Sequence, residues 1–203
     1  KQVTEICLPL QRALKNNPKP ITLHEPIFDE KEKTYLEECI DSTFVSSVGK
    51  FVNDFESKLS SFVDSKYVIL TQSGTAALQV ALRSAGVTSN TEVLIPSLTF
   101  VATANAVCYL GAIPHFVDSN LETLGMCPKF LKEYLLQICK KTDGGTFNKF
   151  TGREIKAVVP MHTFGHPCLI EDLIDIASHY NLVLIEDAAE GLGSFYRGRH
   201  LGT

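Results

Sequence analysis

The sequence predicts an α/β protein in which a largely parallel sheet is covered by helices on both faces. Short apolar segments alternate with segments of helical periodicity from about residue 66 to residue 187. The apolar segments are almost continuously hydrophobic, as strands buried on both faces are. Gly86 and Gly111 follow two of the helical segments as C′ glycines do. Strands that alternate with helices in this way indicate a parallel sheet with helical crossovers.

The first part of the chain precedes this alternation. We expect a helix over residues 3–15, ended by residues 16–20, in which Pro18 and Pro20 form a stiff linker. Asp29 is placed to cap a second helix through residue 40, and apolar residues at helical spacing return in residues 50–63. Residues 44–50 between these helices are typical of a loop. We therefore expect an N-terminal helix and linker over residues 1–20 and one domain over residues 21–203.

The alternating elements follow in order. We expect strands at residues 66–71, 92–96, 113–118, 155–161 and 182–187. We expect helices at residues 74–86, 99–111, 128–141 and 170–180, the third of them opened by a proline at its first position. The polar segment over residues 143–154 is expected to be a loop or a small hairpin.

The composition excludes several classes of protein. The 203 residues have a net charge of −4 and no dominant basic face, so we expect no nucleic-acid partner. No apolar segment reaches the roughly 18 residues of a membrane span, and the first residues lack the pattern of a signal peptide. The six cysteines include no C-x-x-C pair, and the sequence has no N-x-[ST] sequon. We expect a cytoplasmic protein with reduced cysteines, no membrane contact and no metal site.

Polar residues gather where the expected strands end, which is where ligands bind in an open parallel sheet. The candidates are Ser73 to Thr75, Pro96 to Phe100, Pro160 to His162, and the pair Glu186 and Asp187. Gly74 allows close approach to the first turn of a helix, whose free N–H groups can hold an anion. Ser73 and Thr75 add hydroxyls to this turn. The alternative is an ordinary helix cap followed by small residues.

Other site types fit less well. The Walker A pattern G-x-x-x-x-G-K-[ST] is absent, and no G-x-G-x-x-G follows a strand. His162 and His166 have a spacing that would suit zinc on a helix, but Gly165 and Pro167 prevent a helix there. A loop with hydrogen-bonded imidazoles is favoured, and His162, nearer to the strand end, is kept as a candidate for ligand contact.

One cofactor joins the remaining candidates. A carboxylate at the end of a hydrophobic strand costs free energy unless it is paired. An anion at Ser73 to Thr75, a flat ring against Phe100 and a protonated ring nitrogen on Asp187 together describe pyridoxal 5′-phosphate. The ion pair would offset the desolvation of Asp187. Because side chains alternate along a strand, Glu186 should point away from Asp187 and be structural.

Four segments resemble the DegT/DnrJ/StrS family of sugar aminotransferases, which depend on pyridoxal phosphate and have the aspartate aminotransferase fold, fold type I. The segments are QSGTAALQVAL, IPSLTFVATANAV, VVPMHTFGHP and IEDAAEGLGSFYRGRHLGT. The likeness extends from about Ile21 to Thr203, in the same order and spacing. FVSSVGKFVNDFE and residues 143–167 are most similar to a branch that aminates UDP-4-keto-6-deoxy-N-acetylhexosamines, in pathways of the bacillosamine and legionaminic acid type.

The resemblance implies roles for individual residues around the cofactor. Ser73, Gly74 and Thr75 would bind its phosphate, Phe100 would stack on its ring, and Asp187 would pair with its nitrogen.

Further roles follow from the resemblance on the substrate side. Glu190 would lie near the ring hydroxyl or the substrate, and Ser46 and Ser47 would approach the sugar. The family also implies a homodimer whose active sites are built from both subunits.

The implied reaction is transfer of an amino group, with glutamate as donor, to a nucleotide-linked 4-keto sugar in bacterial surface-sugar biosynthesis. The Schiff-base lysine of the family lies after the position of Thr203, and neither Lys149 nor Lys156 matches it. We therefore expect the N-terminal part of a large domain, without the C-terminal small domain and inactive by itself. Two alternatives stay open. One is a lysine-free sugar 3-dehydratase of the same family, and the other is a non-catalytic short form that binds the cofactor.

Overall fold

The computed structural model describes residues 25–203 and divides the chain into two compact units, Lys1–Gly49 and Lys50–Thr203. The helix expected over residues 3–15, the linker after it and the boundary expected at residue 20 lie outside the described residues. None of the helices within residues 25–203 has both the length and the apolar character of a membrane span.

The described part of the first unit contains helix α2, Glu30–Asp41. Asp29 is its N-cap, as expected. The Asp29 side chain accepts a hydrogen bond from the Lys31 N–H at 2.7 Å, and the Glu32 carboxylate accepts one from the Asp29 N–H at 2.6 Å. This reciprocal capping box satisfies N–H groups that the start of a helix leaves free. The helix ends at Asp41, and the predicted loop follows it.

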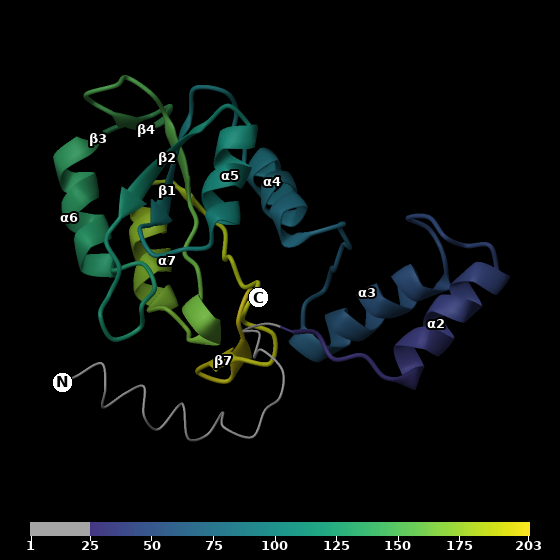
Figure 1. Cartoon of the computed structure of the whole chain (residues 1–203). Helices are drawn as coiled ribbons and strands as arrows, with labels where there is room; N and C mark the ends of the chain where they lie inside the picture. The colour runs from purple at the N-terminus through teal and green to yellow at the C-terminus, as the bar shows by residue number, and fades with distance from the viewer. Residues whose placement is uncertain (1–24) are drawn as a thin grey trace, which may run out of the picture. The chain divides into compact units, whose positions relative to one another are not determined.

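The second unit is an α/β structure (Figure 1). Its helices are α3 Lys50–Val63, α4 Gly74–Ser84, α5 Val101–Tyr109, α6 Pro128–Ile138 and α7 Ile170–His179, with a short 3-10 turn η1 at Thr163–Gly165. Its strands are β1 Glu92–Pro96, β2 Ile113–Val117, β3 Cys139–Thr142, β4 Gly145–Asn148, β5 Ile155–Val158, β6 Val183–Leu184, β7 Phe195–Tyr196 and β8 Arg199–His200. Strands β2, β1, β5 and β6 form a parallel sheet in that order, and β3–β4 and β7–β8 are antiparallel hairpins.

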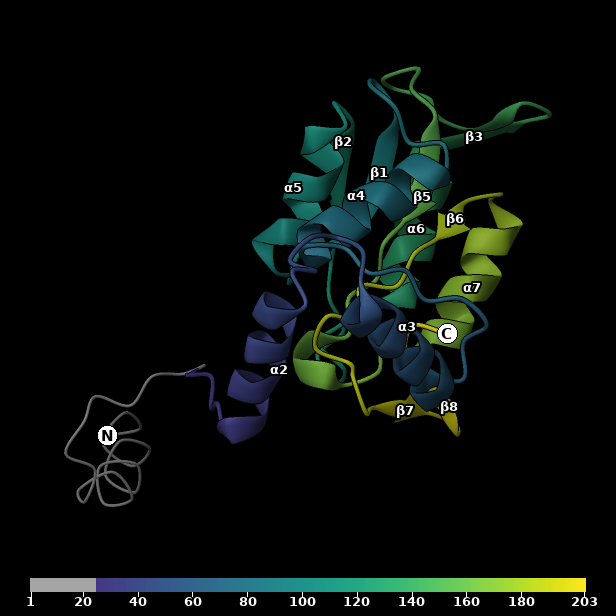
Figure 2. The same cartoon turned by 90° about the vertical axis from the view of Figure 1, so that its right-hand side faces the viewer.

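Helices cover both faces of the parallel sheet (Figures 1 and 2). Alternate side chains of β1 point to opposite faces. Val93 and Ile95 join a core with α4 and α5, whereas Leu94 joins a core with α6 and α7. All three side chains are completely buried. The predicted fold class is therefore confirmed, including the helices on both faces.

The expected strand over residues 66–71 is wrong. These residues are irregular and mostly exposed, and the Ile69 side chain is 81% exposed. A strand needs a neighbour to accept and donate its backbone hydrogen bonds. No neighbouring strand pairs with this segment in the part of the chain that the structure describes. Its apolar composition alone therefore did not determine its conformation.

The last sheet strand is shorter than expected, but its pairing continues toward the site. Strand β6 covers only Val183–Leu184. Beyond it, the Ile185 N–H donates to the Val158 carbonyl at 3.0 Å, and the Asp187 N–H donates to the Pro160 carbonyl at 2.8 Å. The chain after β6 thus stays alongside the chain after β5 as far as Asp187.

The polar segment after α6 is a hairpin. The helix expected to reach residue 141 ends at Ile138, because the next residues pair as β3 with β4. The completely buried Glu92, at the start of β1, anchors the chain that follows β4. Its carboxylate accepts hydrogen bonds from Asn148 Nδ2 at 2.9 Å and Thr151 Oγ1 at 2.6 Å, and His115 Nε2 lies 3.3 Å away. This network lies at the amino ends of the sheet strands, the edge opposite to the candidate site.

Candidate cofactor site

A cavity of about 300 Å³ lies beyond the carboxyl ends of the sheet strands. It is lined by Gly74, Thr75, Leu78, Phe100, Ala102, Met161, Asp187, Ala189 and Glu190. Phe100 follows β1, Met161 follows β5 and Asp187 follows β6. Because parallel strands end at the same edge of a sheet, segments far apart in sequence meet here. The structure thus brings together the start of α4, Phe100, Asp187 and Glu190, as the sequence predicted.

Asp187 is the buried charge of the cavity. Its side chain is 5% exposed. Its backbone N–H donates to the Pro160 carbonyl, and its backbone carbonyl accepts from the His162 N–H, so the segment after β5 holds it by two hydrogen bonds. Its Oδ2 accepts a hydrogen bond of 2.6 Å from Thr103 Oγ1. Its Oδ1 has only a long contact of 3.4 Å with the Ala189 N–H. A carboxylate has about four lone-pair positions, so Oδ1 retains capacity for a donor located in the cavity.

Thr103 is a site residue that the sequence analysis missed. Its side chain is 1% exposed, and its only hydroxyl proton goes to Asp187, because an ionised carboxylate only accepts. The Thr103 oxygen can in turn accept from the Thr99 hydroxyl, 2.9 Å away and one helical turn earlier. The signal available in the sequence was this pair of threonines four residues apart at the start of a helix that follows a strand.

The N-terminus of α4 forms another side of the cavity. Ser73 is the N-cap, and its hydroxyl accepts from the Ala76 N–H at 3.2 Å. The N–H groups of Gly74 and Thr75 have no acceptor among the described residues. A Cβ atom placed on Gly74 would meet nothing within 4 Å. Free N–H groups, a helix dipole and open space suit an anion such as a phosphate group. The Ser73 hydroxyl caps the helix, and phosphate contact by Ser73 stays a prediction.

Phe100 provides a flat apolar wall. It is the N-cap residue of α5, and its side chain is 66% exposed although it lines the cavity. Its N–H lies 3.3 Å from Met161 Sδ, so the backbone at this position contacts the chain after β5. An aromatic face left open beside a cavity can stack against a planar ring.

Glu190 fixes the loop on the remaining side. Its Oε2 accepts a hydrogen bond of 2.7 Å from the Phe164 N–H in η1. A Cβ atom on Gly165, which has φ +77°, would lie only 2.7 Å from the Glu190 carbonyl oxygen. Glycine at this position therefore permits close packing of η1 against the loop that contains Glu190.

The remaining predicted residues do not meet at the cavity. His162 is completely buried and is bonded to Glu186, with Nε2 and Oε2 2.7 Å apart, and neither residue lines the cavity. Glu186 therefore has the structural partner that strand alternation predicted. Ser46 and Ser47 belong to the first unit, where they form an exposed bend. Sugar binding by these serines stays a prediction.

Cys168 does not add a nucleophile to this region. Burial, and then the charge of Glu186, raise the pKa of its thiol to about 12. A thiol with such a pKa is protonated at neutral pH and is a poor nucleophile. No group of three or more His, Cys, Asp or Glu side chains arranged to hold a metal ion occurs within residues 25–203.

The family model for the DegT/DnrJ/EryC1/StrS aminotransferase family matches residues 26–203. The chain belongs to this family. The predicted family and fold type are thus confirmed. The chain is 38% identical over 185 residues to the GDP-perosamine synthase of Escherichia coli O157:H7, a match that covers 91% of this chain and 46% of that protein. It is 34% identical over 183 residues to the GDP-perosamine synthase of Caulobacter vibrioides, covering 90% and 45%. The chain thus spans about half the length of these relatives.

Solved structures give the same assignment. The aminotransferase from Psychrobacter cryohalolentis superposes with a TM-score of 0.76 and 29% identity, over 90% of this chain and 42% of that one. A Bacillus subtilis protein named NtdA, solved with bound cofactor PMP, superposes with a TM-score of 0.70 and 28% identity, over 90% and 40%. Family membership and this cofactor-bound relative support pyridoxal phosphate as the expected cofactor.

Proposed function

We propose that this chain forms the cofactor-binding part of a pyridoxal phosphate-dependent aminotransferase of nucleotide-linked keto sugars. One observation carries the proposal. The buried Asp187 leaves one carboxylate oxygen with spare acceptor capacity in a cavity whose other walls are an open helix N-terminus and an exposed aromatic face. The family and the relatives named GDP-perosamine synthase support the reaction class.

The residues present fit the cofactor. The Gly74 and Thr75 N–H groups would hold its phosphate, and the Phe100 side chain would cover one face of its ring. Asp187 would hold a proton on the ring nitrogen, with Thr103 keeping the carboxylate oriented. When bound, pyridoxal phosphate withdraws electrons from the carbon that bears the exchanging amino group. An ionised Asp187 favours that withdrawal, because it stabilises the positive charge on the ring.

The finer parts of the proposal concern the complete protein. Glutamate is the amino donor, and a 4-keto sugar on a nucleotide is the acceptor. The similarity of FVSSVGKFVNDFE favours a UDP-linked sugar, whereas the relatives reported above are named for a GDP-linked one. A lysine after residue 203 supplies the amine that binds the cofactor, and two copies of the protein form a cytoplasmic homodimer. Glu190 is proposed to lie near the ring hydroxyl of the cofactor or the substrate, and Ser46 and Ser47 are proposed to approach the sugar.

The first test is cofactor binding by the full-length protein. We expect Asp187→Asn to weaken pyridoxal phosphate binding by about 100-fold, because truncating one member of a buried charge pair costs about 3 kcal/mol. Asp175→Asn, on the exposed side of α7, is the matched control and should bind like the wild type. Equal binding by the Asp187 and Asp175 variants would contradict the role given to Asp187.

The second test follows the cofactor and the amino group. Borohydride reduction and mass spectrometry should find a cofactor adduct on a lysine after residue 203. With glutamate and either a UDP- or a GDP-linked 4-keto sugar, the product should gain an amino group. Bound cofactor without any lysine adduct would instead indicate the dehydratase branch, and absence of cofactor binding would overturn the enzyme proposal.

A further inference from the structure

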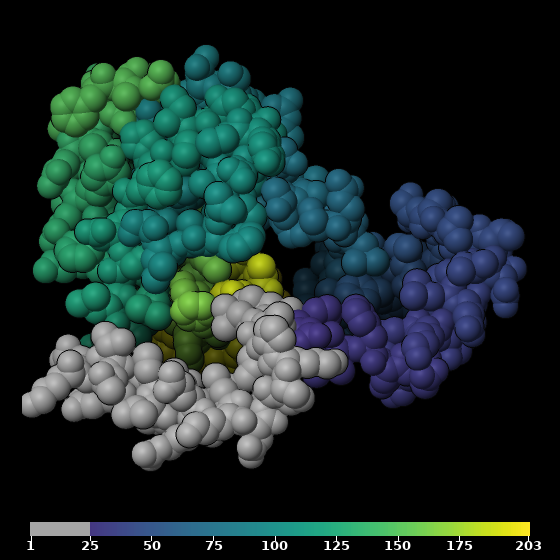
Figure 3. Space-filling view, viewed as in Figure 1, coloured from purple at the N-terminus to yellow at the C-terminus, as the bar shows by residue number. Residues whose placement is uncertain are grey.

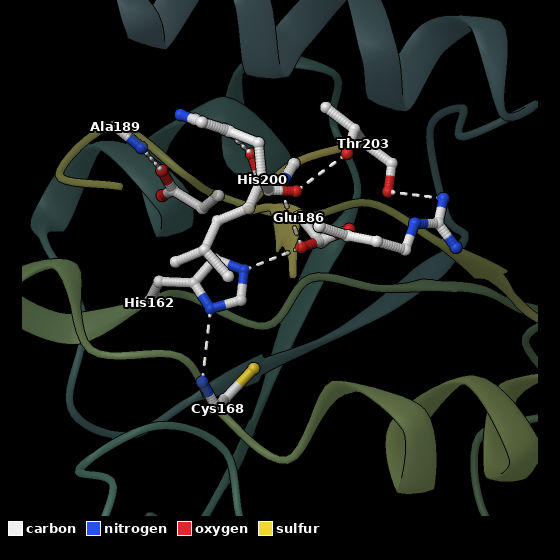
Figure 4. Close-up of polar contacts among 10 residues, drawn as sticks. His162, Cys168, Glu186, Ala189, His200 and Thr203 are labelled. Carbon is white, nitrogen blue, oxygen red and sulfur yellow. Dashed lines mark hydrogen bonds and ion pairs between the residues drawn. The ribbon is translucent and has the colours of Figure 1, made fainter. Parts of the chain in front are cut away.

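Glu186, the neighbour of Asp187, joins three segments of the chain (Figure 4). Its Oε2 accepts hydrogen bonds from His162 Nε2 at 2.7 Å and from the Gly202 N–H at 3.1 Å. The His162 side chain is completely buried, and the Glu186 side chain is 16% exposed. One carboxylate oxygen therefore connects the chain after β5, the chain after β6 and the segment after β8.

The hydrogen bonds of His162 define its protonation. Its Nδ1 accepts from the Cys168 N–H at 3.2 Å, and a backbone N–H can only donate. The ring proton is therefore on Nε2, where it points to Glu186. A neutral imidazole held in this way is a fixed donor, and its own backbone N–H also donates to the Asp187 carbonyl at 3.1 Å. His162 thus binds both members of the acidic pair, one through its side chain and one through its backbone.

The Gly202 contact supports the cavity wall from behind. A Cβ atom on Gly202 would lie 3.1 Å from the Ala188 Cβ, and one on Gly191 would lie 3.3 Å from the Leu201 Cβ. Leu201 and Gly202 therefore pack directly against the turn Ala188–Gly191. That turn contains Ala189 and Glu190, which line the cavity. In the space-filling view, yellow atoms from the last part of the chain are visible at the surface of the α/β unit (Figure 3).

We propose that Glu186 is a positioning residue for the cofactor site, which holds the Asp187 strand end and the Ala188–Gly191 turn in place through its two hydrogen bonds. The inference rests on the proposed function for the identity of the cofactor. It assigns Glu186 a role through geometry, since its side chain does not line the cavity. The proposed role requires a side chain long enough to meet both donors and an oxygen at its end that accepts their hydrogen bonds.

Two substitutions separate reach from charge. Glu186→Gln keeps the length of the side chain, and its amide oxygen can accept from both His162 and Gly202 while the charge is removed. Glu186→Asp keeps the charge but is one methylene shorter, so that it cannot meet both donors without a backbone shift. Glu171→Asp is the matched control, because Glu171 forms an exposed ion pair with Arg197 of the β7–β8 turn.

The experiment uses the full-length protein and pyridoxal 5′-phosphate as the probe. Backbone amide exchange of residues 201–203 is measured without cofactor, and the dissociation constant and visible circular dichroism are measured with it. Losing one or both of these hydrogen bonds is expected to change an equilibrium constant by about tenfold. We expect Glu186→Asp to accelerate exchange at Gly202 and raise the dissociation constant by about tenfold each, with a weaker visible signal. For Glu186→Gln, the Gly202 exchange rate and the dissociation constant should both stay within about threefold of the wild-type values. For Glu171→Asp, both should equal the wild-type values.

Several results would overturn the inference. If Glu186→Asp binds the cofactor as tightly as the wild type and exchanges the Gly202 amide at the same rate, the two hydrogen bonds do not position the site. An equal loss in Glu186→Gln would show that charge is what matters. If the wild-type protein takes up no cofactor, the proposed function fails. The exchange comparison between the two Glu186 variants would then still confirm or contradict the positioning of the Ala188–Gly191 turn.

Discussion

Replacing Thr103 by valine should measure how strongly the site holds its buried carboxylate. Valine has nearly the same shape as threonine but lacks the hydroxyl that lies 2.6 Å from Asp187 Oδ2. Both side chains are at least 95% buried, so water cannot readily replace the lost donor. A hydrogen bond to a charged group contributes about 1.5–3 kcal/mol, so we expect the free energy of unfolding to fall by about 2 kcal/mol.

The matched variant is Thr103→Ser, which keeps the hydroxyl and loses one methyl group, at a cost of about 1 kcal/mol. The assay is urea unfolding of the cofactor-free protein, followed by far-ultraviolet circular dichroism. For an m value of about 2 kcal/mol/M, the valine variant should unfold at a urea concentration lower by about 1 M. The serine variant should shift the midpoint by about half of that or less.

A double-mutant cycle with Asp187→Ala tests whether the lost energy belongs to this pair. When the carboxylate is absent, Thr103→Val should cost only about 1 kcal/mol or less, because the hydroxyl has lost its charged acceptor and keeps only the contact with Thr99. Equal destabilisation by valine and serine, or an undiminished effect of valine in the Asp187→Ala background, would refute the reasoning.

Three further predictions concern other parts of the α/β unit. Iodoacetamide at pH 8 should modify the exposed Cys108 and spare the buried Cys168. The raised pKa of about 12 leaves only roughly one Cys168 thiol in ten thousand ionised at that pH. Comparable labelling of the two cysteines in peptide mass spectra would contradict this. Gly165→Ala should destabilise the protein by at least about 1 kcal/mol more than Gly152→Ala, measured by urea unfolding, because both have positive φ but only the first Cβ meets backbone. Glu92→Gln should cost about 1–3 kcal/mol in the same assay yet leave cofactor affinity unchanged; weakened binding would contradict its placement at the opposite sheet edge.

The order of the elements accounts for only part of the candidate site. Phe100 and Asp187 each follow a strand of the parallel sheet. Because parallel strands end at one edge of a sheet, these two residues meet there whatever their distance in the chain. Thr75 begins a helix after residues 66–71, which form no strand, so this rule does not explain why Thr75 also lines the cavity.

The features that sequence reasoning missed depend on partners from distant segments. Thr103 has an ordinary helical context, and only the position of Asp187, 84 residues later, gives its hydroxyl a role. Glu92 lies in an apolar strand as a lone charge, and its donors belong to the hairpin and the turn after it. The segment at residues 66–71 had the composition of a strand but has no neighbouring strand among the described residues. The composition of a segment can be read directly from the sequence. Whether that segment pairs as a strand also depends on a second segment, which the sequence does not identify directly.

The two adjacent acids at the end of β6 show how one strand end serves two purposes. Alternation places Glu186 and Asp187 on opposite sides of the chain, but their hydrogen bonds distinguish them more sharply. Glu186 concentrates two donors on one oxygen and lies outside the cavity lining. Asp187 has one short bond on Oδ2 and keeps Oδ1 nearly free beside the cavity. A buried carboxylate with spare acceptor capacity gains free energy by recruiting a protonated group, whereas a carboxylate whose donors are already in place gains little. We therefore expect Asp187 to be the acid that binds a ligand, and Glu186, together with Thr103, to be what keeps it in position.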